Sequence, residues 1–204
     1  MNSILKYTVS NEALAAEPRE ALRYLGYKKA AAPDADILLA ADWLKRVRPV
    51  LRPAACYSEF EISFKSGGLI TLPWGEIKSL DLSKNLQGCK SVYIFAATIG
   101  IDFDRLLCRA RLSSMADAAF IQAAGATYIE SFVDGLCGFL KNEAAGRGLK
   151  CKARYSPGFG DFVLENQIGL FSVLNPSKHI GLSLKENCIM VPEKSVTAIM
   201  GLYE

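Results

Sequence analysis

The stretch MADAAFIQAAGATYIESFVDGLCGFLKNEAA, residues 115–145, decides the fold. Ser114 and Asp117 have the spacing of a capping box, and Gly146 follows the last apolar residues, so the sequence predicts one long helix over 115–145. Nearly every residue from 118 to 140 is apolar or small. A helix of this kind is buried on most of its circumference, which is typical of a helix that crosses a sheet in an α+β domain.

Glu130 and Asp134 are the only charged residues between 118 and 140. They are four residues apart and therefore share one face of the predicted helix. The small or short side chains near them on that face belong to Ala123, Ala126, Thr127 and Cys137. Two acids beside small residues indicate a shallow groove, and a solvated polar stripe explains the same pattern equally well.

Shorter elements surround the long helix. The strongest strand pattern is SVYIFAATIG, residues 91–100, which is apolar on both faces and therefore predicts a central strand. Residues 55–64 and 69–74, separated by Ser66-Gly-Gly, predict a hairpin. The other predicted elements are two short helical pieces in 11–26, helices at 34–47 and 165–174, a loop at 175–176, and strands near 180–184, 188–192 and 195–202. No linker or repeat divides the chain, so the sequence predicts one domain over 1–204.

The composition of the 204 residues sets broad limits on function. Half of the residues are hydrophobic and the formal net charge is only +3, with the basic residues scattered among acids, so no nucleic-acid partner is expected. No apolar run is long enough for a membrane span or a secretory signal, so we expect a cytoplasmic protein with no membrane partner. Six cysteines stand at wide, irregular spacings, and we expect them to be reduced and mostly buried: Cys56, Cys89, Cys108, Cys137, Cys151 and Cys188.

The common catalytic patterns are missing from the sequence. One histidine, His179, is expected in a surface loop, and with the scattered cysteines it does not make a zinc site, so we predict no metal ligand. The sequence contains neither a G-x-S-x-G elbow nor a G-x-x-x-x-G-K phosphate loop. Gly158-Phe159-Gly160 lacks the third glycine of a dinucleotide fingerprint. Hydrolases and nucleotide triphosphatases are therefore disfavoured.

The segment ARYSPGFGDFVLENQ, residues 153–167, combines a cation with a glycine turn and a ring. Arg154 offers a planar fork of donors that suits a carboxylate or a phosphate. A turn at Gly158 and Gly160 lets backbone amides approach a bound group closely. A plain surface turn with an exposed arginine is the alternative interpretation.

Several motifs in the same order carry a family resemblance. They are EALRYLGY (20–27), AATIG (96–100), YIESFVDGL (128–136), ARYSPGFGDFVLENQ (153–167) and SLKENCIMVPEKSV (183–196). Together they resemble the activation (reactivation) domain of cobalamin-dependent methionine synthase, in its short, free-standing form. The resemblance covers most of the chain. It implies a C-shaped α+β domain with a twisted antiparallel sheet, a long central helix and flanking helices.

The resemblance also implies a shallow binding site for S-adenosylmethionine. The family signature there is R-x-x-x-G-Y, and Arg154, Gly158 and Phe159 occupy its positions, with phenylalanine replacing the tyrosine. Glu130 stands where the family has an acid on its long helix. An acid near the N-terminus of the long, multidomain form has no counterpart that the sequence identifies here.

Chemistry suggests a role for each candidate. Arg154 suits the ligand carboxylate, Glu130 with Asp134 suits the ammonium or the ribose hydroxyls, and the ring of Phe159 packs against the ligand. Backbone groups of the turn frame the adenine or the carboxylate, and the turn comprises Ser156, Pro157, Gly158, Phe159 and Gly160. Whether Tyr155 and Ser195 contact the ligand or only close strand ends stays open.

The resemblance implies a role in restoring methylcobalamin after the cobalt has been oxidised. The protein would hold the sulfonium methyl in line with the cobalt, an orientation effect for which no catalytic acid or base is expected. No D-x-H-x-x-G segment occurs in the sequence, so the cobalamin is expected on a partner, either methionine synthase or another corrinoid protein. The electron is expected from a flavodoxin-like donor. The sequence thus predicts a methyltransferase-linked component, and the alternative is a non-catalytic docking or S-adenosylmethionine-sensing module.

Overall fold

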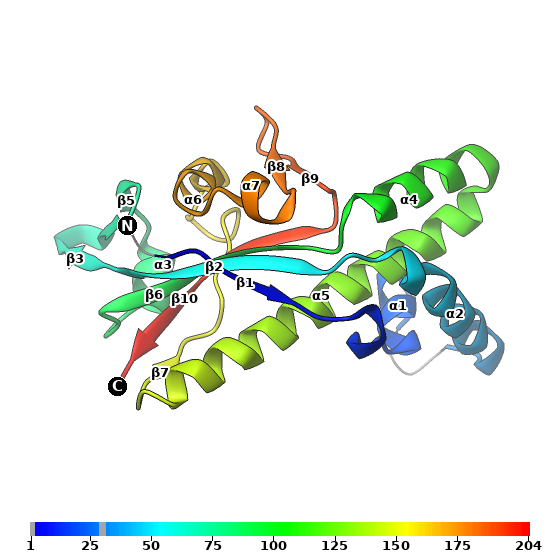
Figure 1. The fold of residues 1–204 in the computed structure, drawn as a ribbon, viewed down its shortest axis with the longest axis horizontal. Helices are drawn as coiled ribbons and strands as arrows, with labels where there is room; N and C mark the ends of the chain where they lie inside the picture. Colours follow the sequence, from blue (N-terminus) through cyan, green and yellow to red (C-terminus); the bar gives the residue numbers. More distant parts are fainter. Residues whose placement is uncertain (1–2, 29–31) are drawn as a thin grey trace.

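The computed structural model describes residues 3–28 and 32–204 and has an α+β fold (Figure 1). Its main sheet has five antiparallel strands in the order β1-β2-β6-β10-β7. The strands are β1 (Leu5–Thr8), β2 (Ala54–Glu61), β6 (Ser91–Thr98), β10 (Ser195–Tyr203) and β7 (Lys150–Cys151). The predicted α+β fold and the central position of the strand near 91–100 are confirmed.

The long helix α5 (Met115–Ala145) runs diagonally across one face of this sheet (Figure 1). It begins where predicted, because the Ser114 hydroxyl accepts a hydrogen bond of 3.2 Å from the backbone N–H of Asp117. At about 1.5 Å per residue, its 31 residues span roughly 46 Å. Fourteen of them are buried, which explains the nearly continuous apolar sequence.

Helices α1 (Pro18–Tyr24), α2 (Asp34–Val47) and α4 (Ile101–Ser113) pack around α5 (Figure 1). Their apolar residues and the α5-facing side chains of the sheet form one core cluster, in which Phe95, Phe103, Tyr128 and Phe132 are almost completely buried. The hydroxyl of Tyr128 donates to the carbonyl of Leu44 at 2.9 Å and so joins α5 to α2. This layer fixes the position of α5 over the sheet.

The opposite face of the sheet carries α3 (Leu80–Asn85), α6 (Asn166–Leu174) and α7 (Pro176–Ile180) (Figure 1). These helices and the sheet form a second core cluster. Successive side chains of β6 alternate between the two clusters, since Phe95 belongs to the α5 core whereas Ile94 belongs to the second core. Two small sheets lie apart from the main one: β3 (Ser63–Lys65), β4 (Leu69–Leu72) and β5 (Gly75–Lys78) form the first, and β8 (Ser183–Leu184) and β9 (Met190–Val191) form the second.

The structure corrects some of the sequence predictions. The hairpin is formed by β3 and β4 only, because β2 ends at Glu61 and pairs with β1 and β6 in the main sheet. His179 lies in α7 rather than in a loop, since Pro176 provides a suitable first helical residue. The six cysteines, all within the described residues, form no disulfide, but only Cys56, Cys89 and Cys137 are buried.

Candidate functional site

The site lies at the edge of β10, beside α5 and α6. After β7 the chain stays extended along β10, where the backbone N–H groups of Lys152 and Tyr155 donate to the carbonyls of Gly201 and Ile199 at 2.8 and 2.9 Å. Successive side chains of an extended segment point to opposite faces. Arg154 therefore turns toward α5, whereas Tyr155 packs against the second core, next to Phe162.

Beyond Tyr155 the chain leaves the strand, and the edge of β10 from Ser195 to Thr197 is not covered by another strand of the described residues. Ile199 exchanges both of its backbone hydrogen bonds with Tyr155, at 2.9 Å each. In an antiparallel strand, every second residue points its backbone N–H and C=O toward the same edge. Thr197 is two residues from Ile199, so its N–H and C=O point toward this edge, where no strand of the described residues covers them. The uncovered edge leaves room for a cavity.

Arg154 is held by the two acids of α5. Its Nη2 lies 2.5 Å from Glu130 Oε2 and 3.7 Å from Asp134 Oδ1. Burial by itself disfavours the charged guanidinium, but the Glu130 carboxylate outweighs that effect and raises the pKa of Arg154 above its ordinary value. The side chain of Glu130 is 41% exposed and that of Asp134 is 74% exposed, so Glu130 belongs to the groove and Asp134 to the solvated stripe.

The turn at 158–160 needs its glycines for two reasons. Gly158 has φ of +95° and Gly160 has φ of +52°, a region that favours glycine. A Cβ at position 160 would also overlap the Asp81 carboxylate and lie 2.7 Å from the Tyr155 hydroxyl oxygen. That hydroxyl donates to the carbonyl of Phe159 at 3.3 Å, which helps to hold the turn closed.

Asp161 fastens the turn to the start of α3. Its carboxylate accepts hydrogen bonds from the hydroxyl of Ser79 at 2.5 Å and from the backbone N–H groups of Leu80 and Asp81 at 2.6 and 3.2 Å. The Ser79 hydroxyl and these amides hold the pKa of Asp161 below its usual value. The acid that follows the glycine turn in the sequence thus positions the turn rather than the ligand.

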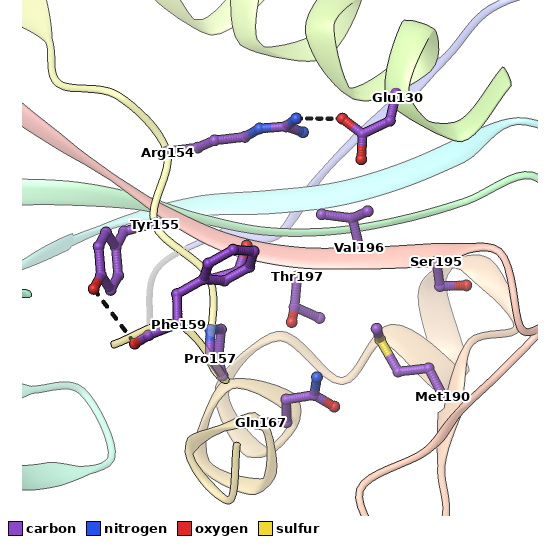
Figure 2. Close-up of a pocket in the computed structure, with 11 residues that line it drawn as sticks. Glu130, Arg154, Tyr155, Pro157, Phe159, Gln167, Met190, Ser195, Val196 and Thr197 are labelled. Atoms are coloured by element: carbon purple, nitrogen blue, oxygen red, sulfur yellow. Dashed lines mark hydrogen bonds and ion pairs between the residues drawn. The ribbon is translucent and has the colours of Figure 1, made fainter. Parts of the chain in front are cut away.

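These elements enclose an open cavity of about 430 Å³, within the range of small-molecule sites (Figure 2). The cavity has an ionic end at Arg154 and Glu130 and a neutral polar end at Gln167, with the ring of Phe159 between them. It is lined by Glu130, Arg154, Tyr155, Ser156, Pro157, Phe159, Gln167, Met190, Ser195, Val196 and Thr197. The arrangement suits an elongated ligand with one charged end and one flat, neutral end.

Two lining side chains have buried polar atoms that lack a hydrogen-bond partner among the described residues. One is Nη1 of Arg154, whose other terminal nitrogen already contacts Glu130. The second is Oε1 of Gln167, a residue that is only 5% exposed. Buried polar groups in folded proteins are usually hydrogen-bonded. A ligand that offers an acceptor to Arg154 and a donor to Gln167 would satisfy both.

The sequence-predicted residues take three kinds of position relative to the cavity. Glu130, Arg154, Ser156, Pro157 and Phe159 line the cavity, as do Tyr155 and Ser195, whose contact with a ligand the sequence left open. Gly158 and Gly160 shape the turn behind the lining, and Asp134 lies outside it. Sequence reasoning missed Gln167, Met190, Val196 and Thr197. Two signals for Gln167 were available: it ends the motif at 153–167, and it stands in the first turn of a mostly apolar helix.

A neighbouring hollow of about 350 Å³ begins on the other side of Glu130. Four acids line it, two from α5 and two from the N-terminal segment around α1: Glu17, Glu20, Glu130 and Asp134. The sequence identified no acid near the N-terminus as part of the site. The structure places Glu17 and Glu20 there because α1 packs against α5.

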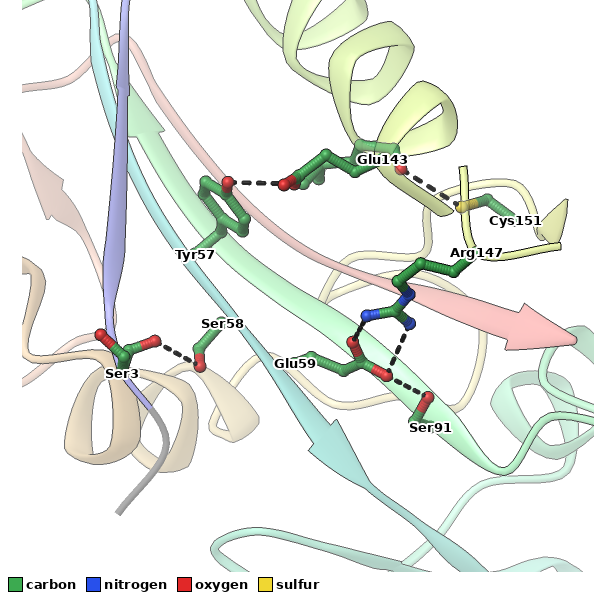
Figure 3. A network of polar contacts seen from close by, with 9 residues as sticks. Ser3, Tyr57, Ser58, Glu59, Ser91, Glu143, Arg147 and Cys151 are labelled. Carbon is green, nitrogen blue, oxygen red and sulfur yellow. Dashed lines mark hydrogen bonds and ion pairs between the residues drawn. The ribbon is translucent and has the colours of Figure 1, made fainter. Parts of the chain in front are cut away.

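Another cavity, of about 570 Å³, opens where the sheet extends past the end of α5 (Figure 3). Several of its polar groups are paired with one another. Arg147 donates to both carboxylate oxygens of Glu59 at 2.6 and 3.2 Å, Ser91 donates to the same carboxylate, and the Tyr57 hydroxyl donates to Glu143 at 3.0 Å. These contacts tie the end of α5 to β2 and β6, so we assign the network a structural role.

The described residues contain neither a candidate metal site nor a candidate membrane span. No group of three or more His, Cys, Asp or Glu side chains in residues 3–28 and 32–204 is placed to hold a metal ion. Within the same residues, no helix has both the length and the apolar character needed to span a membrane.

Comparison with known proteins identifies the fold. No protein-family model matches the sequence, and no curated protein matches it. Thirteen solved chains match the structure, and one of them is the MetH reactivation domain bound to AdoHcy. Its TM-score is 0.73, and the alignment covers 98% of this chain and 78% of that one. This protein has the fold of the MetH reactivation domain.

The reactivation-domain fold confirms the resemblance that the sequence motifs indicate. The two chains are only 17% identical, so the likeness establishes the architecture and not the ligand. Of the residues at the R-x-x-x-G-Y positions, Arg154 and Phe159 line the cavity beside β10, and Gly158 shapes the turn behind the lining.

Proposed function

We propose that this protein binds S-adenosylmethionine in the cavity at the edge of β10. The single observation that carries the proposal is the state of Arg154, which lines the cavity: one of its terminal nitrogens is paired with Glu130, and the other is buried and lacks a partner among the described residues. A ligand carboxylate supplies the missing acceptor in the geometry that a guanidinium favours.

The ionic end of the cavity suits the amino-acid part of this ligand. The ligand carboxylate binds the open side of the Arg154 guanidinium, and its ammonium binds Glu130, so that two positive and two negative groups alternate. On the far side of Glu130, the acids Glu17, Glu20 and Asp134 outnumber the one basic residue of the hollow, Arg23, which pairs with Glu20 at 2.7 Å, so the net charge there is negative. This charge favours a ligand that also carries a positive sulfonium.

The flat part of the ligand fits the remainder of the cavity. Phe159 is 65% exposed, so its ring is available to pack against the adenosine group. The missing tyrosine hydroxyl removes a hydrogen bond but leaves this contact intact. The turn that carries Phe159 is held by Asp161 and Tyr155, so the ring is presented from a fixed support.

We further propose that bound S-adenosylmethionine serves the reductive remethylation of cobalamin carried by a partner, methionine synthase or a related corrinoid protein. The cofactor supplies the cobalt that accepts the methyl group, and a separate flavodoxin-like protein supplies the electron. The residues of this chain bind and orient the methyl donor and need not transfer a proton. The residues available for this are Arg154, Glu130 and Phe159.

Binding is tested by calorimetric titration of S-adenosylhomocysteine into the wild type and into Arg154→Met. Charge-assisted hydrogen bonds contribute about 1.5–3 kcal/mol, so Arg154→Met should bind about 10- to 150-fold more weakly. The matched control is Arg105→Met, which breaks an exposed ion pair of 2.8 Å with Asp102 in α4. It should bind like the wild type. Absence of binding by the wild type, or equal binding by Arg154→Met, would refute the proposed site.

Transfer is tested with methyl-labelled S-adenosylmethionine, a cobalamin protein and a chemical reductant. Label that reaches the cobalamin only when this protein is present supports remethylation. Binding without transfer to any cobalamin protein supports the second candidate, a docking or sensing module. The substitution of Phe159 for the signature tyrosine favours that candidate, because the site lacks a hydroxyl that could position the donor.

A further inference from the structure

We propose that Gln167 is the residue that selects adenine at the neutral end of the cavity, by pairing with the edge of the base that carries the 6-amino group. This inference rests on the proposed function, because it assigns the second half of the same ligand. It starts from Gln167 itself, which no sequence motif assigned to the site.

Gln167 enters the cavity from the helix layer opposite the one that Arg154 contacts. Gln167 is the second residue of α6, on the face of the sheet opposite α5, whereas Arg154 reaches toward α5. The cavity therefore passes around the edge of β10 from one helix layer to the other. Figure 2 shows the amide of Gln167 well away from the ion pair, on the far side of Phe159 and Thr197.

The amide oxygen of Gln167 is unsatisfied within residues 3–28 and 32–204. Gln167 is 5% exposed, and its Oε1 has no partner among the described residues. Its neighbours in α6 are mostly apolar, and Leu170 and Leu174 of the same helix are completely buried. A glutamine that served only packing would be replaced by an apolar residue without loss, because an unpaired buried amide costs folding free energy. A bound group that donates to Oε1 accounts for it.

The surface around Gln167 is suited to a flat ring. The exposed ring of Phe159, the buried Pro157 and the thioether of Met190 line the cavity with Gln167. Rings and a thioether suit a flat heteroaromatic group, whereas a ribose would be expected near acids such as Glu130. The side-chain amide of glutamine offers an acceptor and a donor side by side, the pattern that pairs with the amino group and adjacent ring nitrogen of adenine.

The open edge of β10 supports the same assignment. Thr197 lines the cavity and turns its backbone N–H and C=O to the side that no strand covers within the described residues. A base held by the Gln167 amide would lie beside this edge. The neutral end thus presents side-chain and backbone hydrogen-bonding groups and no charge, which matches an uncharged base.

The test compares two ligands and three proteins by calorimetric titration. The ligands are S-adenosylhomocysteine and its analogue with hydrogen in place of the 6-amino group. The proteins are the wild type, Gln167→Met and the control Gln122→Met. Gln122 also has a buried Oε1 without a partner, but it lies on α5, where its amide donates to Glu193, outside the cavity.

The wild type and Gln122→Met should bind S-adenosylhomocysteine about tenfold or more tightly than the analogue. Gln167→Met should bind S-adenosylhomocysteine about 10- to 100-fold more weakly than the wild type, and should bind both ligands alike. Equal binding of the two ligands by the wild type would overturn the inference, even where Gln167→Met fails to fold. So would an equal loss for both ligands in Gln167→Met.

These outcomes separate the inference from the proposed function. If the wild type binds S-adenosylhomocysteine and the analogue without the 6-amino group equally well, only the role of Gln167 is refuted, and the proposed function stands. Wild type that binds neither ligand refutes both.

Discussion

Gly160→Ala should destabilise the protein, whereas the same change at Gly138 should stabilise it. Gly160 has φ of +52°, and placing an alanine in this left-handed region costs about 1–2 kcal/mol. Its Cβ would also displace the Asp81 carboxylate and the Tyr155 hydroxyl, which adds to that cost. Gly138 lies on the exposed side of α5 with no atom within 4 Å of a new Cβ, so alanine there gains about 0.5–1 kcal/mol of helix propensity.

The assay is thermal unfolding followed by circular dichroism. For a chain of this size, 1 kcal/mol corresponds to about 2–4 °C, so Gly160→Ala should lower the melting temperature by about 2–8 °C or more. Gly138→Ala should raise it by about 1–4 °C. Because Tyr155 lines the cavity, Gly160→Ala should also weaken S-adenosylhomocysteine binding, and Gly138→Ala should not. A Gly160→Ala protein as stable as the wild type would show that the turn is not held as described.

Three further perturbations test other parts of the molecule. Burial raises the pKa of Cys56 to about 12. At pH 8 a disulfide reagent should therefore modify the exposed Cys108 and leave Cys56 intact, as mass spectrometry of the products would show. The contribution of the Cys56 thiol to the free energy of unfolding should be complete below its unfolded pKa of about 9 and should fall between pH 9 and 12. Because the pKa of Asp161 is lowered in the folded protein, its carboxylate contributes stability above pH 3.8 that is lost as the pH falls further. Asp161→Ala should therefore lower the melting temperature at pH 7 and reduce the difference in melting temperature between pH 7 and pH 3. An unchanged difference in melting temperature would contradict this. Gly125→Ala should cost about 1–3 kcal/mol in urea denaturation, because its Cβ would overlap the ring of Phe103 in the core; wild-type stability would contradict the close approach of α4 and α5.

Sequence reasoning found the elements whose signals are local. The start of α5 is set by the Ser114 cap, and its apolar length follows from the 3.6-residue repeat. The central strand β6 is apolar on both faces because a helix layer covers each face of the sheet. The family motifs led to Arg154, Glu130 and the turn at 156–160 because those residues stand close together in a few short segments.

Other features depend on contacts between distant segments. β2 leaves the predicted hairpin because it pairs with β1 and β6, and no local pattern encodes that choice. Glu17 reaches the hollow beside Glu130 only because α1 packs against α5. The separation of these segments along the chain hides such contacts from any periodicity argument.

The amino-acid sequence by itself determined where the long helix α5 and the central strand β6 form, because capping and periodicity act over a few neighbouring residues. It also marked Arg154 as a cation beside a glycine turn. Only the tertiary structure decided that this cation pairs with Glu130 on one helix layer while Gln167 enters the same cavity from the other layer. The reason is that the cavity exists where β10 is left uncovered between α5 and α6, and strand order in a sheet is set by packing across the whole chain.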